Sequence, residues 1–455
     1  MRVPLAAPAA YGRQLRTIIE RFETSQWWSP EVLERYQLDQ LGQFLAHAHE
    51  TVPFCRERLA AAGYRPGQAI SWDFWRSLPR MGRGDVQDLG DALRCASLPP
   101  EHGGAMKIST TGSTGRPVTV WRSGQQMLVM AAVVLRKLLW QGWDFRLKLG
   151  VIARDTRDAS FAPAGARFST WGSPAGDLYE TGSAVLLDNR SSTAEIADWL
   201  LREAPDYLRV TPGVLRDLCF HFMDERIPVP ALKGIQCSSE ITGHDLRDLV
   251  RHVFGLPVFA SYGAKEFGTI AVQCPEHEHY HVQAEALLVE VLDDAGNPCL
   301  PGETGTVVIT ALQGFAFPLI RYEVGDRAVA AGPCPCGRPH PVLAQVVGRV
   351  RDPIVLPSGE RRYVYTGRGF SFWQYTDLRQ FQIIQRTLHD LEVKLVARRS
   401  LTPDVEAEIA RRIKAATSEH FAIRFTYHDA IPPGPGGKLR DFVCEVDQPS
   451  GPLPR

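Results

Sequence analysis

The chain has 455 residues, enough for two or three domains, and its 44% hydrophobic and 22% charged residues are typical of an ordinary globular protein. The 51 lysines and arginines balance the 51 aspartates and glutamates, so the net charge is zero. No general electrostatic field therefore attracts the protein to nucleic acid or to an anionic membrane, and we expect neither as a partner.

The N-terminal segment MRVPLAAPAAYGRQ is too short and too interrupted by proline to be the core of a signal peptide. No apolar run approaches the length needed to span a bilayer. The nine cysteines are scattered over a long chain, which fits reduced thiols or metal ligands better than a disulfide framework. We therefore expect a cytoplasmic protein.

The first 100 residues are expected to form helices. Ser29 is a typical N-cap, Pro30 suits the first helical position, and apolar residues follow at helical spacing from Leu33 onward. Further along, the apolar run over residues 125–140 predicts a long buried helix.

Between residues 147 and 260, short β-like runs alternate with helical ones, as in LKLGVIA, TAEIADWLLREA and YLRVT. This rhythm is typical of an α/β fold with largely parallel strands. From about residue 285, strands are separated by Gly, Pro and Asp turns, and the natural prediction there is antiparallel pairing.

A second, smaller unit is predicted near the C-terminal end. After GRVRDPIVLPSGE, the segments QFQIIQR and DLEVKLVAR alternate as strands, and Thr402-Pro403 opens a helix. We expect an α/β fold class, with a large multi-sheet domain over residues 1–348, a small α+β domain over 349–446 and a tail over 447–455.

The stretch KISTTGSTGRPVTVWRS (107–123) combines glycines with a run of hydroxyl side chains. Its backbone N–H groups can point into one concavity because glycine tolerates positive φ, and its side chains add donors and a positive charge. These features suit a polyphosphate cradle, with a plain polar turn as an equal alternative. No Walker-type G-x-x-x-x-G-K-[ST] motif occurs in the chain. The residues of the proposed cradle are Ser109, Thr110, Thr111, Gly112, Ser113, Thr114, Gly115 and Arg116.

Three further segments carry groups that suit a nucleotide site. In SYGAKEFG (261–268), Tyr262 can stack on a base and Glu266 can hold Mg²⁺. In FPLIRYEVGDR (317–327), we expect Asp326 in a turn after a strand, where it can accept hydrogen bonds from ribose. In GPGGKLRDF, Lys438 can deliver a cation to a reacting phosphate. The structural alternatives are a helix N-terminal carboxylate, an Asx-turn and a solvated lysine, respectively.

Seven motifs in order resemble those of the adenylate-forming superfamily: STTGSTGRP, SYGAKEFG, GETGTVVIT, FPLIRYEVGD, GRVRDPIVLPSG, FQIIQ and GGK. The PLIRY segment, the cysteine pair that follows it and FQIIQ are most similar to the phenylacetate-CoA ligase family. The resemblance extends from about residue 30 to residue 446.

This resemblance implies that ATP and a small-molecule carboxylic acid react to an acyl-adenylate, and that a thiol, with coenzyme A expected, then takes the acyl group. It implies that Ser109 to Arg116 grip the phosphates of ATP and that the adenine lies against Ser261, Tyr262 and Gly263. It further implies that Glu266 binds Mg²⁺, that Asp326 holds the ribose with Arg349 near it, that Asp352 is the hinge before the small lid domain, and that Lys438 is the adenylation lysine.

The chain departs from the family pattern in three places, which leaves alternatives to coenzyme A open as the acceptor. YEVGD lacks the commoner arginine after the tyrosine, TPG (211–213) has glycine where serine is usual, and LPSGERRYVYTG differs from the usual run after the hinge. The alternatives are transfer to an amine or to a carrier-protein thiol, or a non-catalytic, zinc-stabilised nucleotide-binding protein. A monomer or a homodimer is expected.

Two short clusters, CPEHEHYH (274–281) and CPCGRPH (334–340), carry ligands that Zn²⁺ prefers. Cys274, His281, Cys334 and Cys336 are the expected ligands of a structural zinc ion, with thiols that bind no metal as the alternative. The acyl pocket is expected between the helix after the phosphate loop and the strand before Tyr262. Three aromatic residues are expected near it or in the core, namely Trp140, Trp143 and Phe267.

Overall fold

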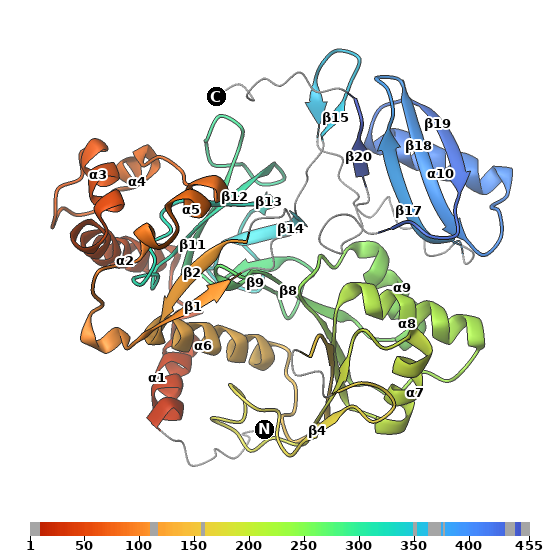
Figure 1. The fold of residues 1–455 in the computed structure, drawn as a ribbon, viewed down its shortest axis with the longest axis horizontal. Coiled ribbons are helices and arrows are strands. Elements are labelled where there is room, and N and C mark those ends of the chain that lie inside the picture. Colours follow the sequence, from red (N-terminus) through yellow and green to blue (C-terminus); the bar gives the residue numbers. More distant parts are fainter. Residues whose placement is uncertain are drawn as a thin grey trace.

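The computed structural model describes residues 10–109, 117–155, 160–348, 353–362, 375, 378–432 and 442–446, with the side chain of Arg362 left out. Within these residues, the molecule has a large body and a smaller C-terminal unit with a sheet of its own (Figure 1). The predicted α/β class is confirmed.

The N-terminal part is helical, as predicted, and forms the red and orange side of the body in Figure 1. Ser29 caps its longest helix, because its side chain accepts a hydrogen bond from the Val32 N–H at 3.4 Å, and Pro30 occupies the first helical position. The helices are α1 (Ala10–Ser25), α2 (Pro30–Thr51), α3 (Pro53–Ala61), α4 (Trp72–Ser77) and α5 (Arg83–Leu89).

The predicted phosphate loop lies between the two strands of an antiparallel hairpin, β1 (Ala105–Ser109) and β2 (Thr119–Ser123). The chain then enters the long helix α6 (Gly124–Trp140), which Ser123 caps by accepting a hydrogen bond from the Gln126 N–H at 3.2 Å. The long buried helix predicted after the loop is therefore confirmed.

A twelve-stranded sheet forms the centre of the body, and one half of it is largely parallel, as predicted. Helices α7 (Thr193–Glu203), α8 (Pro212–Glu225) and α9 (His244–Phe254) cover one face of this half, and α6 lies on the other side (Figure 1). Its strands are β3 (Leu149–Ala153), β4 (Ala166–Phe168), β5 (Ala184–Asp188), β6 (Tyr207–Val210), β7 (Gly234–Cys237) and β8 (Val258–Ala264). Within this half, only the pair of β4 and β5 is antiparallel.

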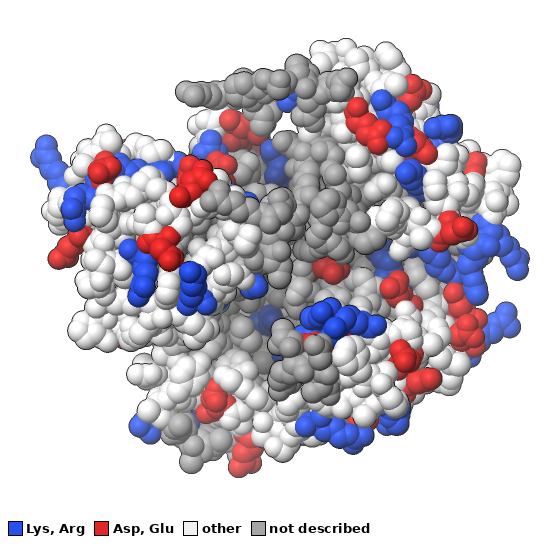
Figure 2. Space-filling model, viewed as in Figure 1, with Lys and Arg blue, Asp and Glu red and all other residues white. Residues whose placement is uncertain are grey.

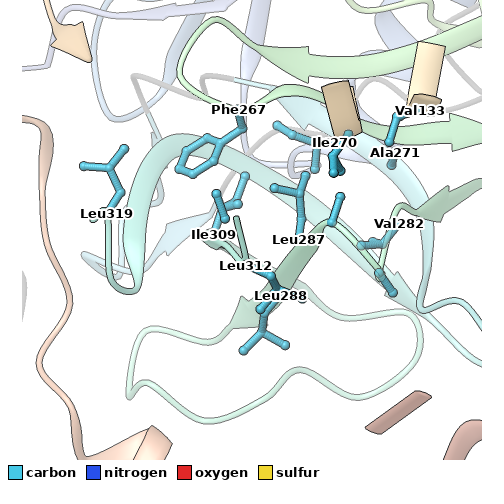
Figure 3. Close-up of a cluster of buried hydrophobic side chains, with 14 of the residues drawn as sticks. Val133, Phe267, Ile270, Ala271, Val282, Leu287, Leu288, Ile309, Leu312 and Leu319 are labelled. Carbon is cyan, nitrogen blue, oxygen red and sulfur yellow. The ribbon is translucent and has the colours of Figure 1, made fainter. Parts of the chain in front are cut away.

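The other half of the sheet is antiparallel throughout, which also agrees with the prediction. Its strands are β9 (Gly268–Gln273), β10 (Tyr280–Val282), β11 (Leu287–Leu292), β12 (Thr304–Ala311), β13 (Tyr322–Ala331) and β14 (Val342–Gly348). Aliphatic side chains of these strands pack with Val133 of α6 and with Phe267 into a dense apolar cluster (Figure 3).

The C-terminal unit is a four-stranded sheet with one helix, and it has a separate core around Val393, Leu395, Ile409 and Ile413. The predicted helix begins after Thr402 with Pro403 at its first position. The elements are the hairpin β15 (Ile354–Val355) and β16 (Arg361–Arg362), the strands β17 (Leu378–Gln385), β18 (Asp390–Ala397), β19 (Ala422–Tyr427) and β20 (Phe442–Cys444), and the helix α10 (Pro403–Ala416). The boundaries at 348/349 and 446/447 stay predictions.

The two units touch through charged side chains. Arg379 of β17 places its Nη2 atom 2.7 Å from Oδ1 and 2.9 Å from Oδ2 of Asp224 on α8, and Arg398 adds its Nη1 at 2.8 Å from Oδ1. The Arg379 guanidinium also lies over the ring of Phe220, 4.4 Å from its centroid. Basic and acidic side chains are interspersed over the face shown in Figure 2, in keeping with the zero net charge.

Among the described residues, the structure contains no helix with both the length and the apolar character needed to cross a membrane.

Candidate active site

The candidate active site lies where the sheet changes from parallel to antiparallel pairing. Residues 258–260 of β8 pair in parallel with β7, whereas Ser261, Tyr262 and Gly263 pair antiparallel with β9. The carboxyl ends of β3, β6 and β7 lie at the same edge of the sheet, and ligands of α/β proteins bind at such edges. The three residues predicted to contact adenine therefore lie at a favourable position.

Tyr262 and Asp326, predicted to bind adenine and ribose, are in direct contact. The Tyr262 hydroxyl donates a hydrogen bond to Asp326 Oδ2 at 2.8 Å. The sequence predicted Asp326 in a turn after a strand, and this detail is wrong, because Asp326 lies inside β13. It follows Gly325, which has φ of +85°, at a bulge where the register between β12 and β13 shifts. The bulge redirects the chain locally, as bulges near functional sites often do.

Gly263 is required by the close approach of β8 and β9. A Cβ atom at this position would lie 2.6 Å from the carbonyl oxygen of Gly268, a backbone atom that cannot easily move away. Gly268 itself has φ of +74°, a conformation that favours glycine. The two glycines thus keep the turn after Tyr262 tight and position Glu266 between them.

Glu266, the predicted Mg²⁺ ligand, is buried among basic side chains. Its Oε1 lies 3.7 Å from Arg83 Nη1, and its side chain is only 3% exposed. The Arg122 guanidinium donates a hydrogen bond to the neighbouring Lys265 carbonyl. Burial lowers the pKa of Arg122, and Glu266 acts in the opposite direction. Glu266 can therefore accept further hydrogen bonds or bind a cation, and the nearby arginines offset its negative charge.

Arg83 and Arg122 lie outside the seven family motifs, and the sequence analysis did not single them out as site residues. Arg83 begins the short helix α5, and Arg122 lies in β2, which leaves the predicted phosphate loop. A lone arginine in a helix or strand gives no signal that distinguishes it from a surface residue. Both become site residues only because the N-terminal helices and the β1–β2 hairpin pack beside the turn that carries Glu266.

Ser109 is the one residue of the predicted phosphate cradle that the structure describes. It ends β1 opposite Thr119, and the two hydroxyl oxygens are 2.9 Å apart. The rest of the cradle, Thr110 to Arg116, lies outside the described residues. So do Arg349, the predicted hinge Asp352 and the predicted adenylation lysine Lys438, and their roles stay predictions.

Of the three aromatic residues expected near an acyl pocket, one lines a cavity. Phe267 and Thr269 face Val129, Met130 and Val133 of α6 across a small, mainly apolar cavity. The tryptophans are core residues. Trp140 donates its indole N–H to Gln26 Oε1 at 2.9 Å, and the ring of Trp143 stacks on that of Tyr207 with centroids 4.4 Å apart.

The cysteine and histidine clusters meet, as predicted, at the end of the antiparallel half of the sheet. One ligand atom from each of Cys274, His279, His281 and Cys334 lies within 4.8 Å of the others. Three of these four residues were predicted as zinc ligands. Cys336, the fourth predicted ligand, lies beside the group, with its Sγ 3.4 Å from His281 Nε2. His279 directly precedes β10 (Tyr280–Val282), and its Nε2 lies 2.9 Å from Cys334 Sγ.

The donor set fits a zinc ion. Two thiols and two imidazoles are typical zinc ligands, and the Cys274 and Cys334 sulfurs are 3.8 Å apart. Burial lowers the pKa of His281 to about 3, which keeps its imidazole neutral and able to coordinate a metal. Burial raises the pKa of Cys334 to about 12, so a bound cation would be needed to hold the thiolate form.

Comparison with known proteins agrees with this architecture. Residues 358–445 match the family described as the CapK C-terminal domain. The chain is 25% identical to phenylacetate-coenzyme A ligase of Thermus thermophilus over 335 residues, which cover 72% of each chain. It superposes on 2-hydroxyisobutyryl-CoA ligase in the postadenylation state with a TM-score of 0.70, at 19% identity, over 90% of this chain and 89% of that one.

The same 2-hydroxyisobutyryl-CoA ligase in its thioesterification state gives a TM-score of 0.56 at 20% identity, over 91% and 90% of the two chains. This chain therefore superposes better on the former structure. The ordered motifs, the fold and these likenesses converge on one assignment. Together they support the phenylacetate-CoA ligase-like family of adenylate-forming enzymes, which the sequence motifs also resemble.

Proposed function

We propose that the protein is an ATP-dependent, AMP-forming carboxylate ligase that passes its acyl group to coenzyme A. In the first step, a carboxylate oxygen of the acid attacks the α-phosphorus of ATP, and the bond to pyrophosphate breaks. In the second step, the thiolate sulfur of coenzyme A attacks the acyl carbon, and AMP leaves. The observation that carries the proposal is the contact between Tyr262 and Asp326 next to the buried Glu266.

Tyr262 and Glu266 come from one segment and Asp326 from another, and together they form the nucleotide side of the site. Asp326 accepts hydrogen bonds from the ribose hydroxyls, and its bond to Tyr262 fixes both side chains before the nucleotide binds. The backbone of Ser261, Tyr262 and Gly263 borders the adenine. Ser109 begins the loop, continuing to Arg116, that we propose cradles the phosphates.

Adenylation brings two anions together, so the site must supply positive charge and orientation rather than an acid or a base. Arg83 and Arg122 supply fixed positive charge at the turn of Glu266. When Mg²⁺ is bound, Glu266 is the carboxylate that would hold it, and the ion would neutralise charge on the phosphates. Lys438 is proposed to contact the reacting phosphate, with Arg349 near the ribose.

The small unit is proposed to act as a lid that turns at Asp352, so that Lys438 is present for adenylation and withdrawn for thioester formation. The contact of Arg379 and Arg398 with Asp224 supports this proposal, because it is an ion-pair contact that can be made and broken without exposing a large apolar surface. A structural zinc ion bound by Cys274, His279, His281 and Cys334 is a separate proposal.

The cytoplasm is the proposed location. It is supported by the nine cysteines, all of which lie among the described residues and are free thiols, as is usual for proteins of a reducing compartment.

The test is a two-stage assay of the full chain. The protein is first incubated with ATP, Mg²⁺ and a panel of carboxylic acids, and pyrophosphate release is measured with hydroxylamine present to trap the acyl-adenylate. Coenzyme A then replaces hydroxylamine, and thioester formation is followed. Acid-dependent pyrophosphate release followed by a thioester is expected. Release without a thioester would redirect the acceptor to an amine or a carrier protein, and no release with any acid would overturn the proposal.

A further inference from the structure

Two buried cations beside the active site have no acidic partner. Lys137 of α6 is 4% exposed, and Arg209 of β6 is partly buried. Among the described residues, Lys137 and Arg209 are close enough for the charge of one to act on the other, and neither forms a hydrogen bond or an ion pair with a carboxylate. An isolated buried charge is strongly unfavourable, so this pair needs an explanation.

The other buried cations among the described residues all have polar partners, and two of them are paired with carboxylates. Arg136, the residue before Lys137, is fully buried and forms an ion pair with Glu285 at 2.7 Å between Nη2 and Oε1. Arg321 is held in the same way by Glu290 at 2.9 Å between Nη2 and Oε1. A lysine that only filled space in the core would be replaced without loss by methionine, which is apolar and of similar length.

The fold brings Lys137 and Arg209 to one side of the sheet. Successive residues of a strand point to opposite faces. Leu208 and Val210 pack in the core under α7, α8 and α9, and Tyr207 stacks on Trp143, which follows α6. Arg209 therefore shares the face of Tyr207 and faces the side of the sheet on which α6 lies.

A third polar group on this face also lacks a partner. Gln236 of β7 is the register partner of Arg209, and it is only 1% exposed. Neither its amide nitrogen nor its amide oxygen has a hydrogen-bond partner. Two cations and an amide N–H group thus offer donors to the same region, and no described residue supplies an acceptor for them.

The region is enclosed, because Lys137 and Gln236 are almost fully buried, and the accessible surface of Arg209 shows that a small group can still reach it. Burial, with a smaller contribution from Arg209, lowers the pKa of Lys137 to about 7, and burial also lowers the pKa of Arg209. Arg209 nevertheless keeps accessible surface. Solvent can therefore reach Arg209, and an anion placed beside it would restore the charge balance.

Arg209 and Gln236 lie one layer below the proposed site of adenylation. Gln236 pairs in register with Phe259 of β8, and Ser261 follows two residues later on the same face. Two residues of a parallel strand span about 7 Å. An acid whose carboxylate reacts next to Ser261 and Gly263 would therefore extend its other end toward Lys137, Arg209 and Gln236.

We propose that Lys137, Arg209 and Gln236 form the distal end of the acyl pocket and bind a second anionic group of the substrate. The substrate is then a dicarboxylic acid rather than a simple aliphatic or aryl monoacid. Its two carboxylates are joined by a straight-chain or aromatic spacer that spans the distance of about 7 Å between the two layers. This inference rests on the proposed function, because it places the reacting carboxylate at the nucleotide.

The test compares dicarboxylic acids with monocarboxylic acids of the same chain length or ring in the pyrophosphate assay. The wild type is expected to use the diacids with a kcat/KM at least tenfold above that of the matched monoacids. Lys137→Met and Arg209→Met are expected to lose this preference and to retain turnover of monoacids. Lys137→Gln and Arg209→Gln serve as second variants in case a methionine variant does not fold.

The matched control is Lys148→Met, which removes the same charge from a lysine already paired with Glu203 at 3.1 Å. It is expected to keep the diacid preference of the wild type. A preference for monoacids in the wild type, or an unchanged preference in both Lys137 variants, would overturn the inference and leave the proposed function intact.

A binding experiment without ATP separates the two proposals. A diacid is expected to raise the melting temperature of the wild type and not that of Lys137→Met, because only the former has the full set of donors. Absence of a shift in both proteins would overturn the inference even if no acid were turned over. If chloride or phosphate alone gave the same shift and diacids were not preferred substrates, the cluster would be a simple anion site and the inference would also be wrong.

Discussion

Asp224 and Arg379 join the two units of the molecule. A single guanidinium nitrogen of Arg379 lies 2.7 and 2.9 Å from the two carboxylate oxygens of Asp224, and the Arg379 side chain is only 17% exposed. The pair connects β17 of the small unit to the last turn of α8. Its partial burial makes it stronger than a typical surface ion pair.

Asp224→Asn is expected to weaken this arrangement of the two units by about 1 kcal/mol, which corresponds to roughly a fivefold change in a population. If the arrangement serves adenylation, acid-dependent pyrophosphate release should slow by a similar factor. Thioester formation from a supplied acyl-adenylate should be much less affected. The control is Asp248→Asn on α9, which removes a charge from an exposed pair with Arg251. Equal slowing of both half-reactions in Asp224→Asn would contradict the expectation.

Tyr262→Phe removes the hydroxyl group that holds Asp326. A buried hydrogen bond to a carboxylate contributes about 1.5–3 kcal/mol, so we expect the KM for ATP to rise by about tenfold or more with a smaller change in kcat. Steady-state kinetics with varied ATP measure this directly. Tyr36→Phe is the control, because its hydroxyl donates to the Glu285 carbonyl at 3.1 Å, away from the nucleotide residues. A similar KM change in both variants would rule out a specific role for Tyr262.

Gly263→Ala places a methyl group 2.6 Å from the Gly268 carbonyl oxygen, so the turn between β8 and β9 must open. We expect a loss of about 1–3 kcal/mol in the free energy of unfolding and a larger proportional loss of adenylation. Denaturant unfolding and pyrophosphate release measure the two effects. Gly332→Ala should be neutral in both assays, since a Cβ there meets no atom within 4 Å. A stable and fully active Gly263→Ala variant would show that the turn tolerates a side chain.

The stability of the ligand-free protein should depend on pH through Lys137. Its pKa falls from an ordinary 10.5 to about 7 in the folded state, so between these values the unfolded chain binds a proton that the folded chain does not. Stability then rises with pH across this window, by at most about 1.4 kcal/mol per unit. Lys137→Met lacks this contribution and should be the more stable protein at pH 7. Parallel pH profiles of the melting temperature for both proteins would contradict the burial of Lys137.

Removing the proposed zinc should destabilise the antiparallel half of the sheet. Cys274→Ser and His279→Ala are expected to lose bound zinc and to melt at a lower temperature, because each removes one member of the four-residue group. Cys336→Ser should retain zinc if His279 is the fourth ligand. Metal analysis of the purified variants decides between the two residues: loss of zinc in Cys336→Ser together with retention in His279→Ala would restore the ligand set predicted from the sequence.

Local signals in the sequence were sufficient for much of the architecture. The cap at Ser29-Pro30, the long helix α6 and the change from parallel to antiparallel strands are all visible in short stretches, because capping and side-chain periodicity act between near neighbours. The order of the motifs gave the resemblance to the phenylacetate-CoA ligase family and the candidates Tyr262, Glu266 and Asp326.

Only the tertiary structure decided which distant side chains meet. The contact of Arg83 with Glu266, the meeting of Lys137 with Arg209, and the entry of His279 into the metal group join segments that are far apart or carry no motif. These relationships depend on strand order, on register and on the bulge beside Asp326. No single stretch of sequence contains that information, because packing between distant segments sets it.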